Sequence, residues 1–427
     1  MILLLFAVFL LLIIAGLPIA VAIGLSAFTV IFVSGDIQPM VMAQAFTRQV
    51  GSFSLVAIPF FMLAGSIMEK SGITQKLVNF ADAVVGWITG GMAYVAIFAG
   101  MLMGGISGSG PADTAALGGI LIPSMVKAGY PKSYSSAVIA ASGSIGAIIP
   151  PSITMVVLAG VLSQSVGSML MAGLVPGILI GLLLMICSGV ICHTKKYAIN
   201  DKTQFSWAKL WKTFLDAILA LLAPTIIVVG IMGGIFTATE ASVVVSVYTL
   251  VVGMFIYRTV RIKDLKEIFS SAIVSSATVL IIIGICSGFS WILTYYNFPN
   301  MVSQLLMSIS TNKLVIVLLV NIVFLIGGMF MEGLALILMF VPIFAPIMTA
   351  VGVSPMVFGT MILINVVIGT LTPPVGVCLF VSSSISGEKV VRIGKASIPF
   401  ILCMVAVMFL VVLFPELATF VPSMIEG

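Results

Sequence analysis

Long apolar stretches separated by short polar segments run along most of the chain. Seven of them lie at 3–33, 55–68, 173–192, 214–235, 237–257, 268–291 and 397–420. All but the stretch at 55–68 reach the roughly 20 residues that an α-helix needs to cross a bilayer. Gly16 and Pro18 interrupt the first stretch, so the pattern leaves open whether it forms one helix or two, and on which side the N-terminus lies. Because this stretch lacks the basic start of a cleaved signal peptide, we expect it to be a retained membrane segment.

Four further apolar regions are broken internally by glycine and proline, which end or bend helices. Two of them predict re-entrant helical hairpins, at about 92–126 and 314–349. The other two predict crossings that are interrupted in the middle, at about 133–163 and 356–385. Each hairpin is expected to leave the membrane on the side it entered.

The broken regions form an internal repeat. The sequence G-A-I-I-P-P begins at Gly146, and G-T-L-T-P-P begins at Gly369, 223 positions later. At the same offset Gly104, Gly105, Pro123 and Gly129 fall on Gly327, Gly328, Pro346 and Gly352. We therefore predict one transporter domain, 1–427, made of two repeats at about 1–193 and 213–420, with a linker at about 194–212.

Composition and charge place these repeats in a membrane. The 427 residues are 61% hydrophobic and 7% charged, with a mean hydropathy of +1.33, whereas about a quarter of the residues of soluble domains are charged. Most basic residues gather in groups at 70–76, 127–132, 195–212, 258–266 and 389–395. Each group outside the linker falls on uncharged residues when shifted by 223. By the positive-inside rule the equivalent loops face opposite sides, which predicts an all-α, inverted-repeat transporter.

Smaller features complete the outline. Amphipathic segments at 75–87 and 297–309 are expected to lie along the membrane surface as arms, with ordinary loops as the alternative. Trp207 and Trp211 in the linker suit a membrane interface. The five scattered cysteines, without a C-x-x-C pair or clustered histidines, do not indicate metal or disulfide chemistry. The net charge of +5 gives no reason to expect nucleic acid.

Hairpin 1 contains the sequence G-G-I-S-G-S-G-P-A-D-T, which cannot continue a helix. Its backbone groups must be satisfied by protein or water, because lipid offers no hydrogen bonds. Ser107, Ser109 and Asp113 add hydroxyl and carboxylate oxygens, the hard ligands that a small alkali cation requires. A sodium site is the natural hypothesis, and a small-residue helix contact is the alternative.

The interrupted crossings supply further ligands at the ends of half-helices. Freed carbonyls there favour cations, and helix N-termini favour an anionic substrate. No arginine lies in a hairpin or interrupted crossing, so sodium and backbone amides would have to bind an anion. The predicted substrate-binding residues are Ser144, Pro150, Glu332, Asn365 and Thr372.

Two acidic residues lie within apolar sequence, where an unpaired carboxylate costs about 3 kcal/mol or more. Glu332 aligns with Ser109 at the second hairpin tip and is a candidate for facing the transport site. Glu240 is expected to cap a helix near the interface, although a role in transport stays open.

Two other functions fit the sequence less well. Gly105-Ile106-Ser107-Gly108 resembles the G-x-S-G of rhomboid intramembrane proteases, but a serine nucleophile needs a base. The single histidine, His193, lies beside Lys195 and Lys196 at a predicted helix end, where a cation is expected for structural reasons. This position disfavours His193 as the base and therefore disfavours a protease. A channel is also possible in principle, but hairpins and broken helices suit alternating access better.

Four motifs in this order resemble one family. They are G-G-I-S-G-S-G-P-A-D-T, G-x-I-I-P-P-S, F-T-A-T-E-A and G-T-L-T-P-P-V-G. Together they are similar to the large membrane subunit, M or DctM-like, of tripartite ATP-independent periplasmic (TRAP) transporters of the bacterial or archaeal inner membrane. These subunits resemble the wider ion transporter superfamily, in which a mobile domain moves as an elevator against a scaffold.

The resemblance implies partners and ligands. A small four-helix membrane subunit and a periplasmic substrate-binding protein would assist uptake of a carboxylated organic anion, such as a sialic acid, C4-dicarboxylate or keto acid. At least two sodium ions would drive it. Matching positions place sodium at Ser107, Ser109 and Gly146 on one side, and at Gly328, Thr370 and Pro373 on the other. Asp113 would organise hairpin 1 or bind sodium directly. A stand-alone sodium/dicarboxylate symporter is the alternative, and neither the solute nor the oligomeric state follows from the sequence.

Overall fold

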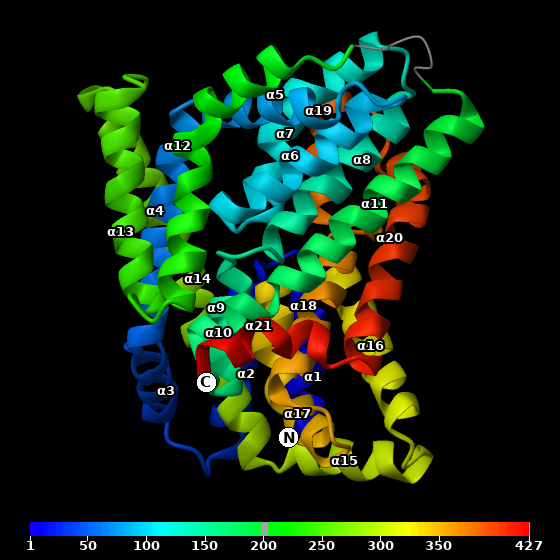
Figure 1. Ribbon diagram of the computed structural model, residues 1–427. Coiled ribbons are helices and arrows are strands. Elements are labelled where there is room, and N and C mark those ends of the chain that lie inside the picture. The colour runs from blue at the N-terminus through cyan, green and yellow to red at the C-terminus, as the bar shows by residue number, and fades with distance from the viewer. Residues whose placement is uncertain (198–203, 427) are drawn as a thin grey trace.

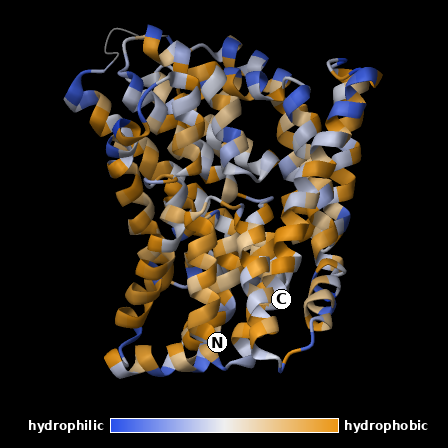
Figure 2. Ribbon diagram, turned by 180° about the vertical axis from the view of Figure 1, so that it is seen from behind, coloured by the Kyte–Doolittle hydropathy of each residue, from blue (hydrophilic) through white to orange (hydrophobic). Residues whose placement is uncertain are grey.

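The computed structural model describes residues 1–197 and 204–426, and these residues form helices and no strand. Residues 198–203, which include Lys202 and part of the predicted linker, lie outside this description. Eight of the described helices are long and apolar enough to cross a membrane. Figure 2, which colours the ribbon by hydropathy, shows mostly hydrophobic residues over the middle of the molecule and hydrophilic residues gathered towards its two ends. The prediction of an all-α integral membrane protein is confirmed.

The first apolar stretch forms two helices, because Gly16 adopts a positive φ of 84° and Pro18 immediately precedes the second helix. The opening helices of the chain are α1 (Ile2–Ile14), α2 (Ile19–Ser34), α3 (Met40–Val50), α4 (Ala57–Lys70, after a 3₁₀ turn at Phe53–Val56) and α5 (Ile73–Val85).

Hairpin 1 consists of α6 (Gly91–Ser107) and α7 (Gly110–Lys127). The crossing that follows is broken: α8 (Lys132–Ser144) passes through a 3₁₀ turn at Ile145–Ala147 and resumes as α9 (Ile153–Leu162). The first half ends with α10 (Val166–Ala172) and α11 (Leu174–Lys195).

The second half repeats the central part of this order, from a short helix through a hairpin to a broken crossing. It contains α12 (Trp207–Met232), α13 (Ala238–Val251, followed by a π-helical turn at Val252–Ile256), α14 (Ile262–Tyr295) and α15 (Phe298–Ile309). Hairpin 2 consists of α16 (Lys313–Phe330) and α17 (Gly333–Ala350), and the second broken crossing of α18 (Pro355–Thr370) and α19 (Val377–Ser386). The chain then forms α20 (Val390–Leu413) and α21 (Glu416–Glu426).

The hairpins enter from opposite ends of the molecule (Figure 1). Helices α6 and α7 occupy the upper half of that view, whereas α16 and α17 occupy the lower half. The arms α5 and α15 lie at opposite ends as well, and both predicted arm segments are helical. Each broken crossing joins the two repeats, since α9 packs against α17 and α19 packs against α7 and α8. The two hairpin tips and the two breaks therefore meet near the middle of the molecule.

Candidate functional site

The tip of hairpin 1 is a two-residue turn between α6 and α7. Gly108 adopts a φ of 63°, and a Cβ added there would collide with the carbonyl oxygen of Pro151. Glycine is required on both grounds, because a larger residue would be strained and would have no room. The turn therefore rests directly on the break of the first interrupted crossing.

Asp113 lies in the first turn of α7 and is wholly buried. Ser107 Oγ donates a hydrogen bond to Asp113 Oδ1 over 2.6 Å and accepts one from Ser109 N over 3.1 Å. The other carboxylate oxygen, Oδ2, is buried without a hydrogen-bond partner, and a Cβ on Gly146 would collide with it. None of the ion pairs in the described part of the chain involves Asp113. A buried carboxylate in this state requires a cation or a proton to offset its desolvation.

Glycines bring the hairpins and the broken crossings into backbone contact in both halves. A Cβ on Gly104 would come within 2.7 Å of the Gly146 Cα, and one on Gly369 within 3.0 Å of the Gly328 Cα. In the second half, Val375 N also donates to Met329 O over 3.1 Å. In each half the hairpin and the break therefore pack backbone against backbone, with no room for a side chain between them.

A cavity of about 220 Å³, here called the central cavity, lies where the tips and breaks meet. Among the predicted site residues, it is lined by Ser109, Ser144, Glu332 and Thr370. The N-terminal turns of four helices also line it: α7 through Gly110, α9 through Ile153, α17 through Gly333 and α19 through Val377. No lysine, arginine or histidine of the described residues lines it.

The two acidic residues in apolar sequence occupy different settings. Glu332 caps α17 by accepting a hydrogen bond from Ala335 N over 3.4 Å, and its side chain is exposed and lines the central cavity. Glu240 belongs to a capping box: its Oε2 accepts from Thr237 N over 2.8 Å at the start of α13. The prediction that Glu240 caps a helix is confirmed.

Several predicted residues lie apart from the central cavity. Pro150 is buried in the break, and Thr372 Oγ1 donates to Ile368 O over 2.8 Å. Asn365 Nδ2 donates to Asn321 O over 3.0 Å and to Asn321 Oδ1 over 2.9 Å. Pro373 packs against α20, since a Cβ on Gly394 would approach its ring. The structure thus groups Ser107, Asp113 and Gly146 on one flank of the cavity, and Gly328 and Thr370 near the other break.

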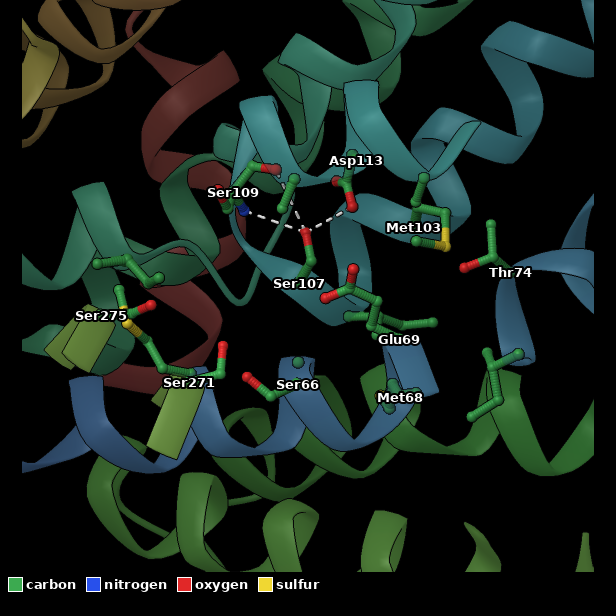
Figure 3. A pocket seen from close by; sticks show the side chains of 17 residues that line it. Ser66, Met68, Glu69, Thr74, Met103, Ser107, Ser109, Asp113, Ser271 and Ser275 are labelled. Carbon is green, nitrogen blue, oxygen red and sulfur yellow. Dashed lines mark hydrogen bonds between the residues drawn. The ribbon is translucent and has the colours of Figure 1, made fainter. Parts of the chain in front are cut away.

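A second cavity of about 170 Å³ lies on another side of the hairpin 1 tip, between it and α4, α5 and α14; we call it the side cavity. Figure 3 shows Ser107 and Asp113 of hairpin 1 across from Ser66, Glu69 and Ser271. Sequence reasoning missed Glu69 because it precedes Lys70 at a helix end, where charges are ordinary. The available signal was hydroxyl spacing, since Ser271 and Ser275 lie one helical turn apart, in a membrane stretch that also contains Ser270, Ser276 and Thr278.

Comparisons with known proteins identify the family. The family model "Tripartite ATP-independent periplasmic transporter, DctM component" matches residues 6–417. The chain is 38% identical over 97% of its length to the isethionate TRAP transporter permease protein DctMQ of Oleidesulfovibrio alaskensis, and it spans 65% of that protein. It is 35% identical to the sialic acid TRAP transporter large permease protein SiaM of Vibrio cholerae, over 97% of this chain and 96% of that one.

Among solved structures, the YdaH transporter of Alcanivorax borkumensis shares the fold, with a TM-score of 0.64 over 88% of both chains at 15% identity. The relatives are named as permeases, so the chain is a transporter component and not an enzyme. The chain belongs to the DctM family of TRAP transporter permeases and is a multi-pass protein of the inner membrane.

Proposed function

We propose that this chain is the large permease subunit of a sodium-driven symporter that imports a small carboxylated organic anion. A periplasmic binding protein would deliver the anion, and a small four-helix membrane subunit would complete the membrane part. The observation that carries the proposal is the buried Asp113 carboxylate, with one oxygen unpartnered, beside a cavity built from both hairpin tips.

Sodium coupling is supported by the chemistry of the first site. Asp113, the Ser107 hydroxyl and the backbone around Gly146 supply hard oxygen ligands in one place. A bound cation would satisfy Asp113 Oδ2 and tie hairpin 1 to the break of the first crossing. A second cation is proposed near Gly328 and Thr370, where the repeat places the equivalent break.

Anion binding is supported by the helix N-termini around the central cavity. The N-terminal turns of four helices line this space. In two of them a side-chain cap already accepts from one amide, Ala335 N to Glu332 in α17 and Met155 N to Ser152 in α9. The remaining first-turn amides and the positive dipole ends favour a carboxylate without any basic side chain. Bound sodium would add positive charge at the flanks. The relative named for sialic acid supports an organic acid as the solute class. Glu332 would accept a hydrogen bond from a hydroxyl or amino group of that solute.

The proposed movement is an elevator in which hairpins and broken crossings travel together. The exchange of α9 and α19 between the repeats favours this, because it joins both hairpins into one packed body. Coupling follows if sodium orders the tips, since the solute then binds well only to the sodium-loaded form.

The experiment is uptake into proteoliposomes that contain this chain and the small membrane subunit. A sodium gradient and the periplasmic binding protein are each supplied or omitted. Uptake that requires both is the expected result. Sodium-driven uptake without the binding protein would instead identify a stand-alone symporter, and uptake indifferent to sodium would remove the proposed cation sites.

A further inference from the structure

The lining of the side cavity is mostly apolar, but the charged residues in it are all acidic. Its oxygen-bearing side chains come from hairpin 1 and from the facing helices α4, α5 and α14, and no basic residue of the described chain lines it. It contains two carboxylates, Asp113 and Glu69, together with hydroxyls that include Ser66 and Ser271. Met62, Ser109 and Ile153 line both this cavity and the central cavity, so the tip of hairpin 1 stands between the two.

Glu69 is a carboxylate in this cavity without a hydrogen-bond or ion-pair partner in the described parts of the chain. Its neighbour Lys70 forms an ion pair with Glu267 over 2.7 Å, so the adjacent positive charge is already engaged. Glu69 itself is exposed and forms no hydrogen bond or ion pair within residues 1–197 and 204–426. In Figure 3 its carboxylate lies towards the tip of hairpin 1 and not away from the molecule.

The side cavity also has a continuation. Ser271 lines it and also an outer groove along the first turns of α14, which includes Ser270, Glu267 and Lys263. Lys70, Lys263 and Lys266 mark this end of the molecule as cytoplasmic by the positive-inside rule. Oxygen-bearing side chains therefore extend from buried Asp113, past Glu69 and Ser271, to the outer groove at the cytoplasmic start of α14, where Lys263 and Lys266 lie beside Glu267 and Ser270.

We propose that the side cavity is the cytoplasmic exit path of the coupling cation, and that Glu69 is the carboxylate that receives the cation as it leaves Asp113. The proposal rests on the proposed sodium coupling and adds to it a residue and a path. A cation leaving a dehydrated site needs successive oxygen ligands, and a fixed negative charge in a narrow cleft concentrates cations. Asp113 holds the ion in the protein, whereas exposed Glu69 passes it to water.

The first test measures the local charge without measuring transport. Cysteine is introduced by Ser271→Cys in the purified permease complex. Its reaction rates with a cationic trimethylammonium and an anionic sulfonate methanethiosulfonate reagent are compared, with modification at position 271 quantified by peptide mass spectrometry. We expect Glu69→Gln to lower the cation-to-anion rate ratio about fivefold. Glu416→Gln, which removes an exposed and unpaired charge on α21, serves as the matched control and should leave the ratio unchanged.

The second test uses transport. Liposomes are loaded with increasing sodium, and binding-protein-dependent uptake is measured, so only transporters with their periplasmic side outward contribute. Glu69→Gln should raise the internal sodium concentration that halves uptake by about threefold or more, and Glu69→Asp should restore the parent value. External sodium dependence should not change.

The outcomes separate the two proposals. If uptake by the unmodified complex does not depend on sodium, sodium coupling itself fails. If it does depend on sodium but Glu69→Gln changes neither the rate ratio nor the internal sodium response, only the exit path is overturned. Failure of both reagents to modify position 271 would also overturn it, because the cavity would be closed to water.

Discussion

Hairpin 1 and hairpin 2 share a backbone plan but place their carboxylates in opposite environments. Asp113 is buried in the first turn of α7 and hydrogen-bonded to Ser107, whereas Glu332 caps α17 and opens onto the central cavity. At the repeat offset Asp113 falls on Leu336, and Glu332 falls on Ser109. Glycine and proline thus repeat the fold, while the side chains at the tips diverge. We interpret the buried Asp113 carboxylate as a ligand of the cation, and the Glu332 carboxylate in the central cavity as a contact of the solute.

The largest effect is expected from Asp113→Asn, which keeps the shape of the side chain and removes its charge. It tests whether the buried carboxylate binds the ion. Losing the carboxylate of the proposed buried cation site should lower sodium-driven uptake about a hundredfold or more, from the 3–5 kcal/mol typical of a buried charge left without its partner. Sodium should also raise the thermal unfolding temperature of the variant less than that of the parent, because only the cation proposed near Gly328 and Thr370 can still bind. Glu332→Gln is the control, and it should keep that sodium-dependent stabilisation.

The two glycine contacts offer the next comparison, through Gly146→Ala and Gly369→Ala. At Gly146 the added methyl group meets Asp113 Oδ2, so it displaces the proposed ion ligand itself; at Gly369 it meets backbone of Gly328 at 3.0 Å. Gly146→Ala should raise the sodium concentration for half-maximal uptake about tenfold, consistent with 1–3 kcal/mol for overpacking. Gly369→Ala should change it less. Equal effects on uptake would argue that the halves bind sodium alike, against the asymmetry described above.

Glu332→Gln tests the other hairpin. Glutamine retains an oxygen that can accept from Ala335 N, so the cap of α17 should survive while the negative charge is lost. We expect the solute concentration for half-maximal uptake to rise about tenfold, as for the loss of one charged hydrogen bond. The sodium dependence should stay as in the parent. An altered sodium dependence with normal solute affinity would move Glu332 to the ion site.

The sequence predicted the backbone of the site better than its side-chain partners. Glycine and proline around Gly146 and Gly369 act on the chain locally, so hairpins and breaks could be located from the sequence alone. The sequence could not show which face of each helix points into the protein, because lipid-facing and protein-facing sides are both apolar and leave no amphipathic period. Asn321 was missed for this reason, since its partner Asn365 lies far along the chain. Glu69 was missed because a charge beside Lys70 at a helix end is ordinary, and its place near Asp113 depends on the fold.

The smallest expected effect on transport concerns Asn365. Its amide bridges α18 to Asn321 of α16, while its own Oδ1 is buried without a partner. Its equivalent in the first half, Ser142, donates only to Val138 O of its own helix, over 2.6 Å. Asn365→Ala should therefore destabilise the protein by about 1–3 kcal/mol, because Asn321 Oδ1 is left without its donor, and this loss should exceed that of Ser142→Ala.

In thermal unfolding, Asn365→Ala combined with Asn321→Ala should cost less than the sum of the two single changes, because both remove one shared bridge. Half-saturation for solute and sodium should stay within about twofold, as expected when no ligand contact is lost. A large loss of solute affinity with unchanged unfolding would show instead that the free Oδ1 reaches the ligand. In that case the second half would contribute a buried amide where the first half contributes a buried carboxylate, and the difference between the two hairpins would extend to the crossings behind them.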